Sequence, residues 1–273
     1  MAEFLIAILF VLLAWFSHRY AWWRPTVPYR YPRILMYHMV APRKPGAQFN
    51  GMRVAPQAFT AQVQWLKSNG WTFVSMSDLV SNWGKHADKT VAITFDDGFE
   101  DNFTAALPIL ADAEANATLY LVDQRQNNDW SRKKKRHHGS GELLRESKLS
   151  DAQVTSMLDS GRIELASHTL SHANLAQSTT DEKATEIVES KATLESNFDH
   201  PISSFAYPFG IYDEYDVSLV RQAGYSNAVT TDPGIDQIGQ PDFFKLKRIK
   251  VSGKEGLWAF RLRLRTGHRG WKK

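Results

Sequence analysis

Short apolar runs alternate with amphipathic segments along most of this chain, and this alternation limits the possible folds more than any other feature of the sequence. Short apolar runs are typical of buried strands, whereas an apolar period of 3.6 residues is typical of helices that cover a sheet. Strands that alternate with helices predict a parallel α/β sheet or barrel. Strands are expected at 34–37, 72–74, 91–95, 117–122, 163–166, 204–207, 227–230 and 246–251, and helices at 56–68, 101–115, 151–160, 180–198 and 214–223.

Length and composition exclude several classes of protein. The 273 residues, of which 43% are hydrophobic and 23% charged, suffice for one large domain or two small ones. A disordered chain, a collagen-like fibre and a disulfide-stapled miniprotein are excluded. The sequence has no cysteine. Disulfides and thiolate metal sites are therefore impossible, and any metal ion must be held by His, Asp or Glu.

The first residues predict a membrane segment. Residues 4–16 (FLIAILFVLLAWF) carry no charged or polar side chain, and extension through Trp23 reaches the length of about 20 residues that a membrane span needs. Aromatic residues near its end suit the headgroup region, towards which Arg19 can extend. Glu3 in place of a basic start, and the lack of a small-residue cleavage site, favour an uncleaved anchor over a signal peptide. A buried core helix is disfavoured because the run is apolar on every face.

Positive charge is concentrated in two segments. The net charge is +4, yet residues 131–138 carry five Lys or Arg and residues 261–273 carry six, with no acid in either, which leaves −7 for the rest of the chain. Such segments are usually solvated surface, and the more specific alternative is contact with anionic lipid headgroups or a phosphorylated glycan. Neither segment lies in a nucleic-acid-binding motif, so no nucleic-acid partner is expected. Apolar and basic residues alternate at 260–265, a pattern that permits either an amphipathic edge strand or an ordinary solvated edge.

Polar residues follow two of the predicted strands, where the catalytic groups of a parallel barrel gather. The run VAITFDDG ends in Asp96 and Asp97, which point to opposite sides of the strand, before a glycine. The run ELASHTLSH ends in His168 and His172, whose i, i+4 spacing puts both imidazoles on one side of a helical turn. Together they favour a metal site over a simple turn and core histidines. Asp with two His leaves positions open for water and substrate, and the same ligands also serve non-haem iron oxygenases.

Two weaker signals come from other strand ends. In the run SFAYPFG, Pro208 fixes the local backbone, so that the Tyr207 N–H can face the site as an oxyanion donor; alternatively the loop packs on the core. The run ILMYH ends the first predicted strand with His38, which the same geometry places at the barrel mouth.

Together these runs resemble the polysaccharide deacetylase (NodB-homology) family of metal-dependent carbohydrate esterases. The resemblance is carried by TFDDG (94–98), SHTLSH (167–172) and FAYPFG (205–210), in that order, and it covers about residues 33–251. LMYH (35–38) is similar to the branch acting on poly-β-1,6-N-acetylglucosamine, in which the late catalytic histidine motif is moved to the front of the domain. The resemblance implies a distorted (β/α) barrel, preceded here by the membrane helix, that removes acetyl groups from N-acetylated amino sugars.

The resemblance also implies a metal site. Position by position, Asp97, His168 and His172 correspond to the family's metal ligands. The implied cofactor is a divalent ion, with zinc expected and cobalt, nickel or iron as alternatives.

Four further residues take catalytic roles from the resemblance. Asp96 corresponds to the general base, Tyr207 to the backbone donor for the oxyanion, and His38 to the acid that protonates the leaving amine. Arg248 corresponds to a basic residue that holds the base in place. The chain departs from the family in two places. No Leu-x-His follows Tyr207, so the acid role rests on His38 alone, and residues 203–205 lack the arginine that often precedes the third motif.

These inferences predict a domain organisation. A membrane anchor is expected at 1–24, a connector at 25–32, the deacetylase domain at 33–255 with a basic insertion at about 124–148, and a basic tail at 256–273. The protein is expected to be a single-pass protein of the inner or cell membrane. Arginines after the span favour a cytoplasmic body by the positive-inside rule, the family favours the opposite side, and the orientation stays open.

The leading functional hypothesis is an anchored N-deacetylase whose substrate is an N-acetylated cell-surface polysaccharide or lipid-linked glycan. Residues 132–138 and 261–273 are the candidate contacts to anionic lipid or phosphate. The alternatives are a hydrolase of the same fold that acts on a formamido sugar or cyclic amide, and a catalytically inactive glycan-binding relative.

Overall fold

The computed structural model of the chain describes residues 1–134, 139–239, 241–268 and 270. The strands are β1 Arg33–Tyr37, β2 Thr72–Val74, β3 Thr90–Asp97, β4 Ala117–Leu121, β5 Ile163–Ser167, β6 Ser204–Ala206, β7 Asn227–Pro233 and β8 Leu246–Lys250. They form one parallel sheet in the order β1-β8-β7-β6-β5-β4-β3-β2. Pairing of β1 with β3, for example Met36 with Thr94, closes seven strands into a barrel and leaves β2 outside. The predicted α/β barrel is confirmed, and every expected strand overlaps an observed one.

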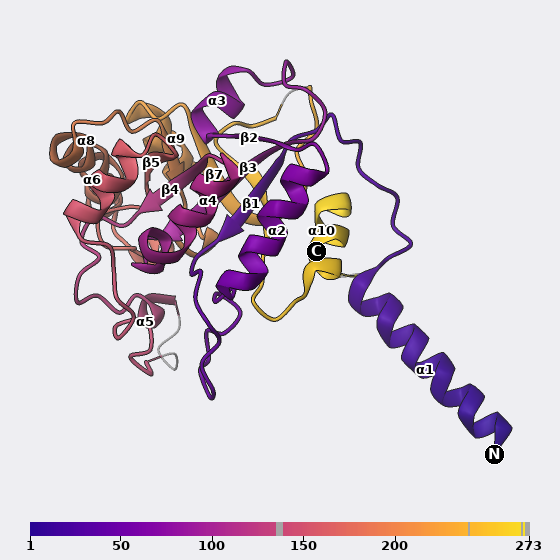
Figure 1. Ribbon diagram of the computed structural model, residues 1–273. Coiled ribbons are helices and arrows are strands. Elements are labelled where there is room, and N and C mark those ends of the chain that lie inside the picture. Colours follow the sequence, from indigo (N-terminus) through magenta and orange to yellow (C-terminus); the bar gives the residue numbers. More distant parts are fainter. Residues whose placement is uncertain (135–138, 240, 269, 271–273) are drawn as a thin grey trace.

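Helices surround the barrel (Figure 1). They are α1 Ala2–Tyr20, α2 Pro56–Ser68, α3 Met76–Ser81, η1 Asn102–Ala106, α4 Leu107–Ala113, α5 Ser131–Lys134, α6 Asp151–Asp159, η3 Leu175–Gln177, α7 Thr180–Ala184, η4 Thr185–Glu189, α8 Ser190–Phe198, η5 Pro208–Gly210, α9 Glu214–Gln222 and α10 Leu257–Thr266. At the N-terminus of several helices, a side-chain oxygen of the N-cap residue accepts a backbone hydrogen bond. Capping boxes join Ser150 to Gln153, Thr179 to Glu182 and Asp213 to Asp216.

Two segments expected as continuous helices contain a π-helical turn. The segment 101–115 divides into η1 and α4, and the segment 180–198 divides into α7, η4 and α8. Pro108 is the second residue after η1 and has no N–H to donate to the preceding turn, which accounts for the irregularity there. The second π turn carries Glu186, which takes part in the site described below.

Side chains on the strands alternate between the inside and the outside of the barrel. Outward residues such as Phe95 and Leu119 are buried in the large core that the barrel shares with the helices. A second cluster combines small residues such as Ala92 and Ala206 with larger ones such as Tyr120 and Leu246. The same alternation continues to the carboxyl ends of the strands, where polar residues replace the apolar ones.

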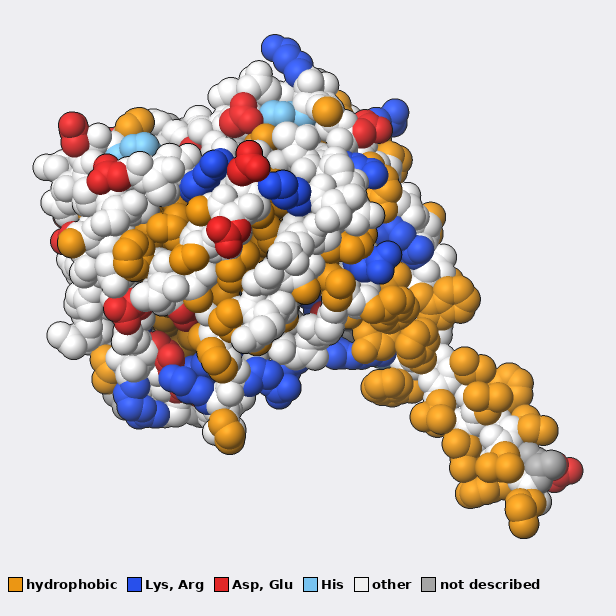
Figure 2. Space-filling view, viewed as in Figure 1, with side chains coloured by type: hydrophobic (Ala, Val, Ile, Leu, Met, Phe, Trp, Pro, Cys, Tyr) orange, Lys and Arg blue, Asp and Glu red, His pale blue; other side chains and the backbone are white. Residues whose placement is uncertain are grey.

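The first helix extends away from the barrel (Figure 1), and its surface is almost entirely hydrophobic (Figure 2). The window Glu3–Tyr20 has a mean hydropathy of 1.5, and none of it is buried. By length and composition this helix can cross a membrane, a property that membrane anchors share with signal sequences. Its last turn contacts the domain, because Phe16 and Tyr20 pack on Trp258 with ring centroids 5.4 and 5.0 Å apart.

Residues 260–265 are helical, so the edge strand considered for this segment is wrong. Helix α10 covers this segment and packs on α2 (Figure 1). Phe260 and Leu264, four residues apart, are buried on one face of the helix. Arg265 donates to the carbonyls of Trp22 and Arg24, so the helix also fixes the segment that follows α1. Residues 269 and 271–273 of the basic segment lie outside the described residues.

Candidate active site

A cavity of about 420 Å³ opens at the carboxyl ends of the barrel strands. The ends of β1, β3, β5 and β6 contribute to its lining, and these are the four places where the sequence predicts functional side chains. Its other walls come from the loop at 48–52, from the insertion that follows β4, from β7 and β8, and from Lys254 after β8. The position agrees with the rule that the active sites of parallel barrels lie at this end of the strands.

Asp97, His168 and His172 meet in this cavity. Asp97 Oδ1 lies 3.5 Å from His168 Nε2 and 3.2 Å from His172 Nε2. One potential ligand atom from each residue can be chosen so that all three lie within 4.8 Å of one another. The residues are only 2%, 2% and 3% exposed, respectively. A single ion can therefore contact all three side chains.

The segment between the two histidines is not the helical turn expected from their spacing. Thr169 and His172 have φ angles of 67° and 57°, in the left-handed region. Glu186 of η4 holds this loop by accepting a hydrogen bond from the Ser171 N–H at 2.9 Å. Asp97, with a φ of 81°, shares the left-handed conformation. Such backbone is strained for residues other than glycine, and it tends to occur at functional sites.

The donor atoms of this cluster fit a cation. His168 Nδ1 lies 2.8 Å from the Ala206 carbonyl oxygen, which holds the proton on Nδ1 and leaves Nε2 as a ligand. Asp97 Oδ2 is buried without a hydrogen-bond partner in the part of the chain that the structure describes. Burial, opposed by the contact with Asp97, lowers the pKa of His172 to about 4. The imidazole is therefore neutral near pH 7, the form that binds metals.

Aromatic side chains enclose His172. Trp130 stacks on its ring at a centroid distance of 5.1 Å, and Phe209 meets it edge to face at 4.4 Å. Trp130 was not among the predicted site residues. The sequence signal that points to it is weak: it is the only Phe, Tyr or Trp between 124 and 148. Its burial shows that the insertion covers the site and is not simply exposed surface.

Asp96 and Arg248 form a buried bidentate pair inside the barrel. Arg248 Nη1 and Nη2 lie 2.6 and 2.7 Å from the two carboxylate oxygens of Asp96. Arg248 also donates to Thr94 Oγ1 and to the Thr230 carbonyl. Burial by itself raises the pKa of Asp96, but the charge and hydrogen bonds of Arg248 outweigh it and lower the pKa below its ordinary value. The expected contact between Arg248 and the acid is therefore present.

His38 and Tyr207 also line the cavity. Burial lowers the pKa of His38, although the charges of Asp97 and Asp96 act in the opposite direction. The Tyr207 N–H donates to the Val229 carbonyl at 3.2 Å, within the pairing of β6 and β7. In this conformation the sheet uses this hydrogen, and the role of oxyanion donor for the Tyr207 N–H stays a prediction.

Two residues that the sequence analysis did not assign to the site fix the position of His38. Asn102 donates from Nδ2 to the His38 carbonyl at 2.8 Å, and Asp101 Oδ1 accepts the Val40 N–H at 2.8 Å. The two residues come three and four positions after Gly98 of the Asp-Asp-Gly run. The start of η1 thus connects the strand that carries the two acids to the loop that carries the histidine.

Asp101→Asn is expected to stabilise the protein at pH 8 and to change its stability little at pH 4. Folding raises the pKa of Asp101 from 3.8 to about 6, chiefly through burial. The group therefore favours folding below pH 3.8, and this contribution is lost as the pH rises through about 6 and the buried carboxylate ionises. Asn stays neutral and keeps the oxygen that accepts from Val40. The gain at pH 8 is at most about 3 kcal/mol.

Urea unfolding at pH 4 and pH 8 measures this difference in the free energy of unfolding. Asp112→Asn, on the exposed side of α4, is the matched control for loss of one negative charge. Equal stability of Asp101→Asn and the wild type at pH 8 would contradict the prediction.

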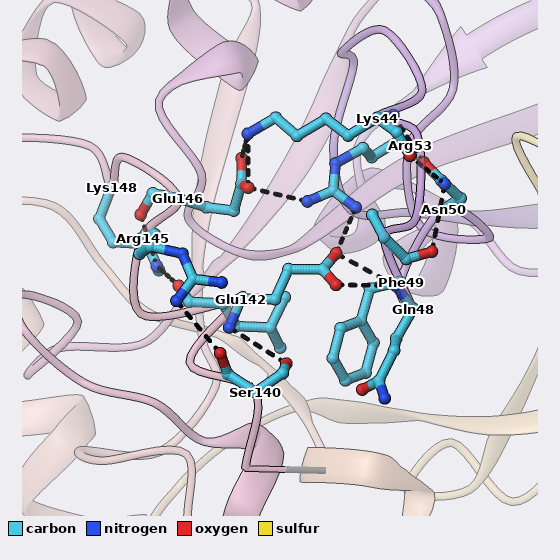
Figure 3. A network of polar contacts seen from close by, with 12 residues as sticks. Lys44, Gln48, Phe49, Asn50, Arg53, Ser140, Glu142, Arg145, Glu146 and Lys148 are labelled. Atoms are coloured by element: carbon cyan, nitrogen blue, oxygen red, sulfur yellow. Dashed lines mark hydrogen bonds and ion pairs between the residues drawn. The ribbon is translucent and has the colours of Figure 1, made fainter.

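Ion pairs fasten the insertion to the loop after β1 (Figure 3). Arg53 is fully buried, and its guanidinium nitrogens lie 2.6 Å from Glu142 and 2.8 Å from Glu146. Lys44 Nζ lies 2.6 Å from Glu146, and Glu142 accepts the Gln48 N–H at 2.8 Å. Gln48 lines the cavity, so this network fixes one of the cavity walls.

The basic part of the insertion lies close to the histidine loop. Lys133 Nζ donates to the Ser171 carbonyl at 2.6 Å, and Lys134 lines the cavity. Residues 135–138 lie outside the described residues. Contact of this segment with anionic lipid or phosphate stays a prediction.

Comparison with known proteins gives three findings. The family model for polysaccharide deacetylase matches residues 84–228. YxkH of Bacillus subtilis, which carries the name of a polysaccharide deacetylase, is 29% identical over 235 residues, covering 85% of this chain and 75% of that protein. The poly-β-1,6-N-acetyl-D-glucosamine N-deacetylase of Staphylococcus epidermidis is 24% identical over 240 residues, covering 80% of this chain and 78% of that protein.

A solved structure shares both the fold and part of the sequence. The Streptococcus pyogenes deacetylase PplD, in complex with acetate, superposes with a TM-score of 0.71 and 26% identity, covering 86% of this chain and 98% of that one.

Proposed function

The chain belongs to the polysaccharide deacetylase family and is an N-deacetylase, and from that premise we propose that it uses a divalent metal ion to hydrolyse the acetamido groups of an N-acetylated amino-sugar polymer or lipid-linked glycan. One observation carries the proposal. A potential ligand cluster of one carboxylate and two imidazoles shares a cavity with a second carboxylate, Asp96, that Arg248 keeps ionised.

Asp97, His168 and His172 would hold the ion. One carboxylate and two imidazoles suit zinc, with cobalt, nickel or iron as alternatives. The buried Asp97 Oδ2, which has no hydrogen-bond partner among the described residues, supports this assignment. When bound, such an ion polarises the acetyl carbonyl and lowers the pKa of water from 15.7 to about 7.

Asp96 would act as the general base. Two of its lone pairs accept hydrogen bonds from Arg248, and the others are free to accept a proton from water. The water oxygen bonds to the acetyl carbon as this proton moves to Asp96. Because Arg248 lowers the pKa of Asp96, the base is already ionised at neutral pH.

His38 would deliver the proton to the leaving amine. The carbon–nitrogen bond then breaks, and the products are acetate and the free amino sugar. Asn102 and Asp101 position the histidine by binding the backbone on both sides of it. Burial keeps His38 mainly neutral before the reaction, so the proton that it delivers would be the one that Asp96 takes from water, passed to His38 within the same cavity during the reaction.

The substrate class and location follow from other features. The name of the S. epidermidis relative supports a poly-N-acetylglucosamine or a related glycan. The apolar helix Glu3–Tyr20 supports a single-pass anchor in the cell membrane. We assign residues 1–24 to the anchor, 25–32 to the connector and 33–255 to the catalytic domain, with α10 packed against it.

Acetate release from defined N-acetylglucosamine oligomers and lipid-linked sugars tests the function. We expect turnover by the metal-loaded protein, complete loss with a chelator, and recovery on addition of zinc, because the cluster has the ligands for one ion. Metal binding without acetate release would favour a formamido sugar or cyclic amide as substrate. Neither metal binding nor acetate release would favour a glycan-binding role.

A further inference from the structure

Three lysines line the cavity in addition to the residues assigned above: Lys134, Lys250 and Lys254. The only acids among the described lining residues are Asp96 and Asp97. Asp96 is matched by Arg248, and Asp97 contacts the two histidines. Lys250 and Lys254 therefore add positive charge that no carboxylate among the described lining residues balances.

Lys250 lies on the same face of β8 as Arg248, the residue that contacts Asp96. Leu246, Arg248 and Lys250 occupy alternate positions on β8, so they share its inner face. Arg248 contacts Asp96, and Lys250 lies one step nearer the mouth of the barrel. The position of its backbone is fixed, because Arg263 donates to the Lys250 carbonyl. In the described part of the chain, Lys250 Nζ has no hydrogen bond or ion pair.

The other two lysines belong to different walls. Lys134 Nζ lies 5.6 Å from the centre of the Phe209 ring, which itself packs on His172. Lys254 follows Gly253, whose N–H donates to the Gly51 carbonyl of the loop after β1 at 3.2 Å. Among the described residues, no ion pair is formed by the Lys254 ammonium. Lysines from the insertion and from the segment after β8 thus face one space.

Like charges around one space repel each other. Lys250 and Lys134 both line the cavity, and burial together with the charge of Lys134 lowers the pKa of Lys250. A neutral acetamido glycan offers only hydroxyl and amide groups, which do not relieve this repulsion. An anionic group placed among the lysines does.

We propose that the cavity recognises an acetamido sugar that carries an anionic group, phosphate or carboxylate, near the acetamide, and that Lys250, Lys254 and Lys134 bind this group. The inference rests on the proposed function and narrows its substrate class. In this arrangement the metal cluster and Asp96 act on the acetamide, while the lysines determine which glycan is accepted.

The test compares three substrates that differ in one group: a neutral β-1,6-linked N-acetylglucosamine trimer, the same trimer with a phosphate, and the same trimer with a carboxylate. For the full-length metal-loaded protein we expect kcat/KM to be at least about tenfold higher for one anionic trimer than for the neutral one. The anionic trimer that is preferred identifies the group. Because the lysines are exposed to solvent, the preference should shrink as ionic strength rises.

Lysine variants assign the effect to the cavity. Lys250→Gln and Lys254→Gln should each reduce the preference about fivefold, the upper range for an exposed ion pair, because kcat/KM falls more for the anionic trimer than for the neutral one. Lys250→Arg should keep the preference. Lys85→Gln, in the exposed loop before β3 at the opposite end of the barrel, is the matched control and should change nothing.

Two outcomes would overturn the inference: equal kcat/KM of the wild type for all three trimers, or equal loss for neutral and anionic trimers in the glutamine variants. The second outcome would mean that the lysines act on the acetyl group itself. Calorimetric Kd values for the same trimers decide the question without turnover. If no trimer releases acetate, the proposed function fails, and tighter binding of an anionic trimer would still support the anion site.

Discussion

Asp97→Asn is expected to reduce affinity for a divalent ion at least about a hundredfold and to abolish acetate release. Replacement of residues that only orient metal ligands costs about 10- to 100-fold, so loss of the single charged ligand should cost more. Asn has nearly the same shape as Asp, and its side chain can still contact His168 and His172. The variant therefore removes the negative charge that compensates the cation and disturbs packing little.

Metal content after dialysis and competition with a chromogenic chelator measure the effect. Asp123→Asn is the matched control, because Asp123 follows β4 at the same end of the barrel and lies outside the ligand cluster. This control should keep both the metal and the activity. Retention of a tightly bound ion by Asp97→Asn would exclude Asp97 as a ligand and would contradict the proposed metal site.

The barrel could be predicted because its strands are buried on both faces. Strands such as β3 and β4 are continuous runs of buried residues, and they end where polar or turn-forming residues begin. A helix with a clear apolar period, such as α2, could also be predicted with its correct first and last residues. The short α3 was missed, since six residues are too few for a period to be recognised.

The C-terminal segment shows why a local period can mislead. Residues 260–265 alternate between apolar and basic side chains, as a half-buried strand does. In the structure Arg263 is buried as well and forms an ion pair with Glu255, so the buried face has a helical period. A pattern that counts every arginine as exposed cannot detect the burial of Arg263, because its partner Glu255 lies outside the helix.

The site was predictable where residue type and strand end coincide, as for the two acids and the two histidines. It was not predictable where tertiary contacts decide. The loop between the histidines takes a left-handed conformation that Glu186 holds from a distant π turn. Trp130 reaches His172 from the insertion, and the Tyr207 N–H is used by a neighbouring strand. None of these partners is close in sequence to the residue it affects.

Asp96→Asn is expected to keep the metal site and to lower kcat about 10²- to 10⁴-fold, the usual contribution of a general base. The amide cannot accept a proton from water at neutral pH. The three residues of the ligand cluster are unchanged, so metal content should equal that of the wild type. This separation of metal binding from turnover distinguishes Asp96 from its neighbour Asp97.

The variant also disturbs a buried ion pair, and its stability must be measured. Arg248 loses its counter-charge, and breaking a buried pair costs about 3–5 kcal/mol. Thermal unfolding will show whether the protein remains folded at the assay temperature.

Arg248→Lys provides a second test of Asp96 as the general base. It keeps a positive charge beside Asp96 but removes the two parallel hydrogen bonds, so the base stays ionised and is less well oriented.

We expect Arg248→Lys to lower kcat less than Asp96→Asn and to leave KM nearly unchanged, because the arginine touches the base and is not proposed to touch the glycan. If Asp96→Asn stays folded, binds metal and turns over at close to the wild-type rate, Asp96 is not the base. The proton would then have to leave water by another group in the cavity, and His38 is the titratable residue positioned to accept it.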